Sequence, residues 1–144
     1  MESLWPDEIA NSEQVRSPVQ ILKEQASLLG KMTKNILLGE IQAVPVGQPN
    51  SAYAFNILAP SLRNYRYSLF TINYNILNIY PIYIALDDEI FKEIYSYKSK
   101  NEAIKIDYEN EFLTILKNIF RSRKAKQILT SLMVESGAMS SNTR

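Results

Sequence analysis

The sequence lacks the two residue types that most often carry out chemistry in proteins. It contains no histidine and no cysteine among its 144 residues. Histidine is the commonest general base and metal ligand, and cysteine supplies thiolate nucleophiles and zinc ligands. Ser-His-Asp and Cys-His constellations, disulfide bonds and cysteine-based metal sites are therefore excluded. We accordingly assign no catalytic residue, no metal ligand and no cofactor, and we expect binding rather than catalysis.

The acidic run Asp87-Asp88-Glu89 is the remaining candidate for catalytic chemistry. It directly follows a predicted strand, and carboxylates at a strand end can bind Mg²⁺ in a nuclease-like site. Glu40 would have to join Asp87 and Asp88 to complete such a site. The same run also fits a capped helix with an acidic first turn. A carboxylate- or metal-dependent enzyme therefore stays open as a second alternative function.

Glycine is too scarce for the common phosphate-binding loops. The chain has four glycines, and neither G-x-G-x-x-G nor G-x-x-x-x-G-K-[ST] occurs. The nucleophile patterns S-x-x-K and G-x-S-x-G are also missing. These absences exclude the nucleotide-dependent enzyme classes that use those loops.

A basic cluster is the densest run of charge in the chain. It lies where one predicted helix ends and the next begins, and with one preceding lysine its members are Lys117, Arg121, Arg123, Lys124 and Lys126. Such a cluster can contact phosphates, which predicts salt-sensitive binding. The formal net charge of +1 is lower than nucleic-acid-binding domains usually carry. Nucleic-acid binding is thus the first alternative function, and a solvated surface is the competing interpretation.

Nine tyrosines form the other conspicuous group, and most fall on segments that alternate as strands do. In the segment 65–75, the odd-numbered positions carry Tyr65, Tyr67 and Leu69, and positions 70, 72 and 74 are apolar or aromatic as well. A sheet that is apolar on both faces must be covered on both faces or used in an interface. We therefore predict an interface that includes Tyr65, Tyr67, Leu69 and Tyr83.

These observations favour a small intracellular protein-interaction module without catalytic activity, of binding, inhibitor, immunity or accessory-subunit type. It would bind another protein, or its own copy as a homodimer, through the tyrosine-rich sheet face or a sheet edge. The N-terminal residues have no apolar signal-peptide core, and no stretch of about 18 apolar residues occurs. We therefore expect a cytoplasmic protein with no membrane partner.

Hydrophobic periodicity predicts an α+β fold. A helix begins at Ser17-Pro18 and keeps helical spacing of apolar residues as far as Met32. Strand-like segments follow over 35–46, 51–59, 65–75 and 80–86, and their short connections favour an antiparallel meander of about four strands. Residues 87–97 fit either a helix or a strand, and residues 103–106 fit a short added strand.

Two predicted helices close the domain and pack on one face of the sheet. The first begins at Asp107, and the second begins at Ser122 and stops at Gly137. The predicted organisation is therefore an N-terminal arm over 1–16, a single α+β domain over 17–136 and a flexible C-terminal tail over 137–144. Within the arm, we expect Trp5 to pack onto the domain.

Overall fold

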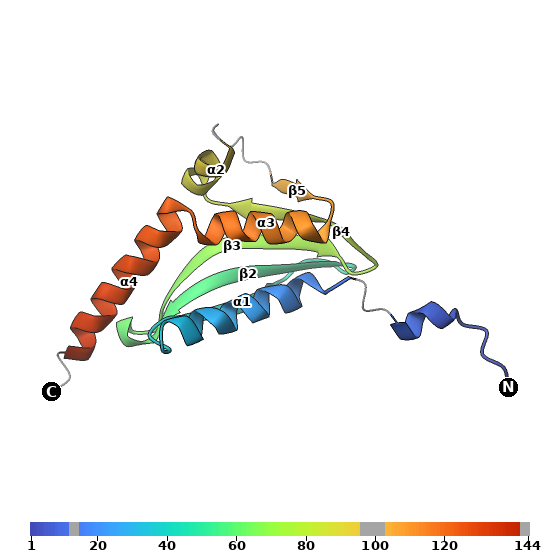
Figure 1. The fold of residues 1–144 in the computed structure, drawn as a ribbon, viewed down its shortest axis with the longest axis horizontal. Coiled ribbons are helices and arrows are strands. Elements are labelled where there is room, and N and C mark those ends of the chain that lie inside the picture. The colour runs from blue at the N-terminus through green and yellow to red at the C-terminus, as the bar shows by residue number, and fades with distance from the viewer. Residues whose placement is uncertain (12–14, 96–102, 142–144) are drawn as a thin grey trace.

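The computed structural model describes residues 1–11, 15–95 and 103–141, and Figure 1 shows how their helices and strands are arranged. The helices are α1 (Pro18–Met32), α2 (Asp88–Tyr95), α3 (Glu109–Phe120) and α4 (Arg123–Ser141), with the 3₁₀ helices η1 (Asp7–Asn11) and η2 (Pro60–Leu62). The strands are β1 (Leu38–Val44), β2 (Asn50–Ala59), β3 (Tyr65–Asn75), β4 (Asn78–Leu86) and β5 (Ile104–Ile106). The predicted α+β fold is confirmed.

The strands form one antiparallel sheet in the order β1-β2-β3-β4-β5, so each strand pairs with its neighbour in the sequence. The meander is the predicted one, extended by the short strand β5. Residues 88–95 are helical, which decides between the two alternatives for most of that segment, and residues 96–97 lie outside the described residues.

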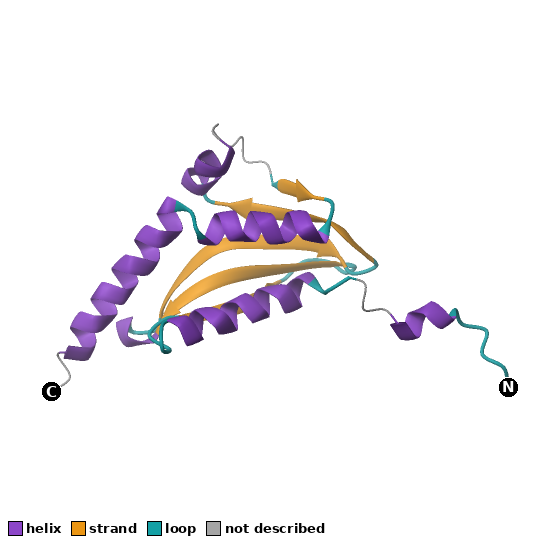
Figure 2. Ribbon diagram, viewed as in Figure 1, coloured by secondary structure: helices purple, strands orange, loops and turns teal. Residues whose placement is uncertain are grey.

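One face of the sheet is covered by α1 and α3, which Figure 2 shows lying in front of the strands with part of the sheet visible between them. Each helix buries one apolar stripe, represented by Ile21 and Leu22 in α1 and by Phe112 and Ile119 in α3. This burial holds the helices on the sheet, because helices of this length gain most of their stability from packing.

Gly39 in β1 allows α1 to lie directly against the sheet. A Cβ atom at this position would lie 2.4 Å from the Cα atom of Ala26. Any side chain larger than hydrogen would therefore push α1 away from β1. The close approach of Gly39 and Ala26 thus fixes the distance between α1 and the sheet.

The helix α4 lies beyond the end of α3 and contacts η2, α2 and α3 (Figure 1). It continues through Gly137 to Ser141, so the prediction that Gly137 stops it is wrong. A glycine inside a helix costs only about 1 kcal/mol relative to alanine, which the neighbouring turns can offset. Residues 142–144 of the predicted tail lie outside the described residues.

The predicted packing of Trp5 is also wrong, because its side chain is 78% exposed. The described part of the arm, with the short helix η1, projects away from the sheet and its helices (Figure 1). Residues 12–14 of the arm lie outside the described residues.

A β-bulge at Leu69 changes which residues of β3 face the helices. In the register with β2, Tyr67 lies opposite Ile57 and Phe70 lies opposite Phe55, and Leu69 has no partner. An extra residue in one strand reverses the alternation of side chains beyond it. The odd-numbered side chains before the bulge and the even-numbered ones after it therefore share the helical face. The inference that this strand is apolar on both faces is wrong for this reason.

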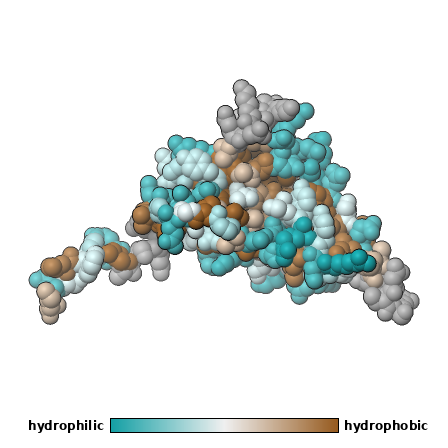
Figure 3. All heavy atoms as spheres, turned by 180° about the vertical axis from the view of Figure 1, so that it is seen from behind, coloured by the Kyte–Doolittle hydropathy of each residue, from teal (hydrophilic) through white to brown (hydrophobic). Residues whose placement is uncertain are grey.

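The opposite face of the sheet carries the polar residues of β3. Its members in that strand are Arg66, Ser68, Thr71 and Asn73, which alternate with the buried positions across the bulge. Figure 3 shows this side of the molecule as a mixture of hydrophilic, intermediate and hydrophobic residues. Across the described ranges, no helix has the length and apolar character needed to cross a bilayer.

Candidate functional site: an apolar groove between three helices

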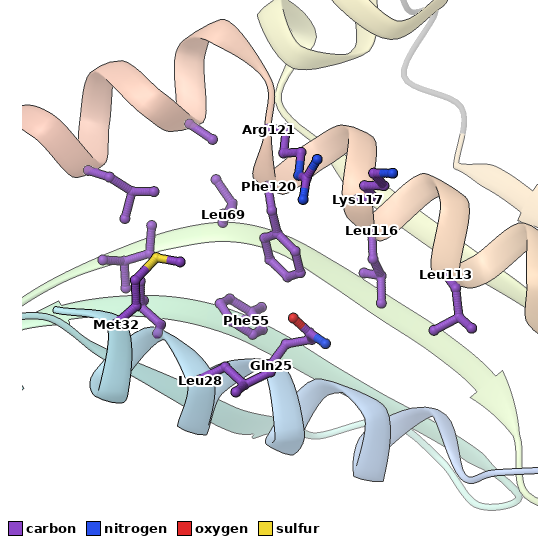
Figure 4. Close-up of a pocket in the computed structure, with 14 residues that line it drawn as sticks. Gln25, Leu28, Met32, Phe55, Leu69, Leu113, Leu116, Lys117, Phe120 and Arg121 are labelled. Atoms are coloured by element: carbon purple, nitrogen blue, oxygen red, sulfur yellow. The ribbon is translucent and has the colours of Figure 1, made fainter.

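A groove opens on the helical side of the sheet, between α1, α3 and α4 (Figure 4). Its volume is about 490 Å³, which falls in the range of ligand-binding pockets. The strands β2 and β3 form its floor, and the three helices form its walls. The groove is therefore built from two strands and three helices that are far apart in the sequence.

The floor of the groove is made of buried aromatic and aliphatic side chains. Phe55 from β2 and the bulged Leu69 from β3 both line it. The Phe55 ring stacks on Phe70 with 5.4 Å between ring centroids and meets Phe120 of α3 at 5.1 Å. Aromatic pairs at these spacings are favourable beyond the area that they bury. The floor is therefore a closely packed apolar surface.

The walls carry apolar side chains that the fold leaves open to solvent. Leu28 and Met32 of α1 are 50% and 81% exposed, and Leu113 of α3 is 37% exposed. Figure 4 shows these three side chains reaching from facing helices toward the groove. Single exposed apolar residues are ordinary, but a set that lines one concave surface is typical of an interaction site.

The rim of the groove is basic. Lys117 and Arg121 lie one helical turn apart at the end of α3 and both line the groove. Neither side chain makes an ion pair within the part of the chain that the structure describes. Cations at a helix C-terminus are favoured by the helix dipole, which explains how the fold tolerates two unpaired charges there. An acidic ligand group would find both of them available.

The remaining members of the predicted basic cluster face elsewhere. Lys124 donates to the carboxylates of Asp87 at 2.8 Å and Glu89 at 3.3 Å. The Asp87 hydrogen bond is the main reason why the pKa of Lys124 is raised. The two carboxylates also offset the unfavourable placement of a lysine at the start of α4.

Arg123 and Lys126 also lie away from the groove. The backbone N–H of Arg123 donates to both carboxylate oxygens of Glu93, at 2.8 Å each, so Glu93 caps α4 from the neighbouring helix α2. Lys126 is exposed on α4. Of the five predicted phosphate-binding residues, the structure brings only Lys117 and Arg121 to the groove.

The predicted metal-binding carboxylates are not brought together. Glu40 lies on the face opposite the helices and accepts hydrogen bonds from Arg66 and Asn56, and the Arg66 bond is the main reason why its pKa is lowered. Asp87 instead pairs with Lys124 and accepts a hydrogen bond from the Ile90 N–H at 3.0 Å, which caps α2. No three acidic side chains within the described ranges are grouped closely enough to hold a metal ion.

The four predicted interface residues lie on two faces of the sheet. Leu69 is buried, and Tyr67 is half-buried against the core, where burial raises the pKa of its hydroxyl. Tyr65 shares their face but is half exposed. Tyr83 lies on the opposite face, where it pairs with Asn73 and is 42% exposed. These residues do not form one continuous surface.

Sequence reasoning missed the groove, although α1 carries a signal for it. Ile21, Leu22 and Ala26 form the stripe that α1 buries. Leu28 and Met32 widen that stripe beyond what one sheet contact requires. An excess of this kind indicates a second apolar contact for the helix.

Comparison of the chain with protein-family models, curated proteins and solved structures finds no match.

Proposed function

We propose that this chain is a protein-interaction module that binds an apolar segment of a protein in the groove between α1, α3 and α4. The observation that carries the proposal is the set of solvent-exposed wall residues Leu28, Met32 and Leu113 above a buried aromatic floor. Full burial of one such side chain contributes about 1.5–3 kcal/mol. A ligand that covers several of them therefore gains enough free energy for specific binding.

The basic rim indicates which charged groups the partner segment should carry. Lys117 and Arg121 lie beside the apolar walls. A segment with acidic residues next to its apolar ones therefore complements both the positive charge of the rim and the apolar surface of the walls. The two helical walls fit the helix-in-groove mode of recognition, in which apolar residues recur one turn apart. We therefore expect an acidic amphipathic segment as the partner.

The groove replaces the tyrosine-rich sheet face as the candidate surface. Leu69 is part of the packed core and Tyr67 packs against it, so these two residues do not form an exposed surface on the sheet face. Leu69 still supports the proposed function from below, because it forms part of the groove floor.

A phage-displayed peptide library tests the proposal, with peptides of about 16 residues, which is long enough for about four helical turns. The selection uses the wild-type chain as bait and the variants Leu28→Glu and Met32→Glu for counter-selection. We expect recovered peptides to carry apolar residues at helical spacing with neighbouring acids. Their affinity should fall at least about tenfold when one wall leucine or methionine becomes charged, as for an interface hot spot.

The variant Leu77→Glu is the matched control, because Leu77 is 82% exposed in the turn between β3 and β4 and lies outside the groove. It should bind the selected peptides as the wild type does. Recovery of no peptide that distinguishes the wild type from Met32→Glu would refute the proposed function.

A further inference from the structure

The N-terminal arm combines exposed apolar side chains with acidic ones, which is the composition expected of a segment that binds in the groove. Its apolar side chains Leu4, Trp5 and Ile9 are 86%, 78% and 57% exposed. The acidic residues Asp7 and Glu8 lie between them, in the first turn of η1. The arm is thus an exposed, acidic segment whose apolar residues recur about one helical turn apart.

We propose that the arm of one copy binds in the groove of a second copy. This inference rests on the proposed function, and it names a second copy of this chain as the partner. Trp5 and Ile9 would cover the wall formed by Leu28 and Met32, with Ile9 close to Met32, and the arm carboxylates would face the basic rim. Tryptophan is among the residue types most enriched in binding hot spots, so an exposed tryptophan on an arm is well suited as an anchor.

Charge complementarity supports this pairing. The rim residues Lys117 and Arg121 have no carboxylate partner within the described chain, and Asp7 and Glu8 have no cationic one. Docking the arm would place two anions near two cations beside an apolar surface, where their attraction exceeds that of fully solvated pairs. Lys124 of the basic cluster does not compete for the arm carboxylates, because its ammonium group is already paired with Asp87.

The position of the arm favours a second copy over the arm's own groove. Arg16 is held at the N-terminal ends of α1 and α3. Its N–H donates to Glu109 at 2.9 Å, and its guanidinium pairs with Glu24 at 3.3 Å. Residues 1–11 project beyond the N-terminal end of α1, on the side away from α4 (Figure 1), whereas the groove lies between α1, α3 and α4. In this arrangement the described arm lies clear of the helices of its own chain, with its apolar side chains exposed, so it is available to a second copy.

Exchange of arms gives a closed assembly. Each copy offers one arm and one groove, so two copies related by a two-fold axis satisfy both sites at once. Neither site is then free to recruit a third copy. The expected species is therefore a dimer rather than a filament.

Fluorescence of the full chain provides the first test, because Trp5 is its only tryptophan. Protein concentration is raised from about 1 μM to about 1 mM, a range that spans weak to moderate affinities. We expect the Trp5 emission to shift to shorter wavelength as concentration rises. Met32→Glu should abolish the shift and Leu77→Glu should leave it unchanged. Emission that stays typical of exposed tryptophan throughout would overturn the proposal.

Engineered cysteines distinguish a second copy from the chain's own groove, since the native chain has none. Ile9→Cys and Met32→Cys are made in separate chains, mixed and oxidised. We expect a disulfide-linked heterodimer that forms faster than the control pair Ile9→Cys with Leu77→Cys. A chain carrying both Ile9→Cys and Met32→Cys that closes only internally as a monomer would overturn the proposal in favour of the arm's own groove.

Charge exchange adds a test of the rim. Lys117→Glu with Arg121→Glu should weaken dimerisation about tenfold or more, and Asp7→Lys with Glu8→Lys in the partner copy should restore it. Absence of rescue would overturn the assigned contact. If selected peptides bind the groove while Trp5 stays exposed and the arm fails to cross-link, the proposed function stands and only this inference fails.

Discussion

Leu69 and Phe70 are consecutive residues of β3, yet both side chains are buried on the helical side of the sheet. The register with β2 explains this, because Phe70 pairs with Phe55 and Leu69 is the extra residue of a bulge. The bulge adds Leu69 to the groove floor without removing Phe70 from the core. It also turns Tyr67 toward the helices.

Tyr67 and Tyr83 should therefore respond differently to the same substitution. Tyr67→Asp places a carboxylate at a half-buried position in contact with the core, and we expect a loss of about 2–4 kcal/mol in the free energy of unfolding. Tyr83→Asp on the opposite face should cost less than about 1 kcal/mol. Urea denaturation followed by circular dichroism measures both. Equal costs would contradict the placement of the two tyrosines in different environments.

Gly39 should be intolerant of even a methyl group. Gly39→Ala would set a Cβ atom 2.4 Å from Ala26 Cα, so α1 must shift, and we expect a loss of about 1–3 kcal/mol or more. Gly137→Ala is the matched control, because Gly137 sits inside α4 and a Cβ atom added there would meet no atom within 4 Å apart from the backbone of its own helix. That variant should gain about 0.5–1 kcal/mol. Thermal unfolding of the two variants tests the contrast, and a neutral Gly39→Ala would contradict the close approach.

Asp87 should make stability dependent on pH in the acid range. Burial is the largest single influence and raises its pKa, but hydrogen bonds from Lys124 and from the Ile90 and Glu89 N–H groups, together with the positive charge of Lys124, outweigh it and hold the pKa below the ordinary value of 3.8. Because the folded state holds the ionised form more strongly, this stabilisation is present above pH 3.8 and is lost as the pH falls through the folded-state pKa.

Asp87→Asn removes the carboxylate charge but keeps the helix cap, because the asparagine side-chain oxygen can still accept the hydrogen bond from the Ile90 N–H. We expect the free energy of unfolding to fall by about 1 kcal/mol at pH 7, and we expect this difference to approach zero below the folded-state pKa of Asp87. Asp107→Asn is the control, because Asp107 makes an exposed pair with Lys105 at 3.9 Å. The Asp107→Asn change should lower the free energy of unfolding by less than about 0.5 kcal/mol, both at pH 7 and below the folded-state pKa of Asp87. Urea titrations at a series of pH values decide whether the two variants differ.

Asn56 should be a sensitive position on the face opposite the helices. It is 1% exposed, and its Nδ2 donates to Glu40 Oε1 at 3.0 Å and to Gln42 Oε1 at 2.9 Å. Asn56→Asp replaces that donor with a carboxylate beside the Glu40 carboxylate, and we expect a loss of about 3 kcal/mol or more at pH 7.

The effect of Asn56→Asp should be smaller in acid. Two carboxyl groups that share a site raise the pKa of one of them, so protonation on lowering the pH removes the repulsion and restores a donor. Ser68→Asp on the same face is the control, because Ser68 is exposed. Chemical denaturation at pH 7 and pH 5 compares the two variants. A loss for Asn56→Asp that is independent of pH would rule out the pairing with Glu40.

The sequence by itself determined the order and type of the elements. The helical spacing through α1 and α3 and the alternation within β2 depend on neighbours only a few residues away, so local patterns suffice to predict them. The short connections likewise implied the antiparallel meander, because parallel strands need longer crossovers. The absence of histidine and cysteine was a property of composition alone and needed no structure.

Only the tertiary structure decided which side chains form the candidate site. Alternation in β3 was misleading, because the bulge at Leu69 depends on pairing with β2 rather than on the strand's own pattern. The groove likewise joins Met32 of α1 to Leu113 of α3, which no local rule relates. The basic cluster was divided because Lys124 meets Asp87 from another element. Such contacts join residues far apart in the chain, so their geometry is set by the packing of the whole fold.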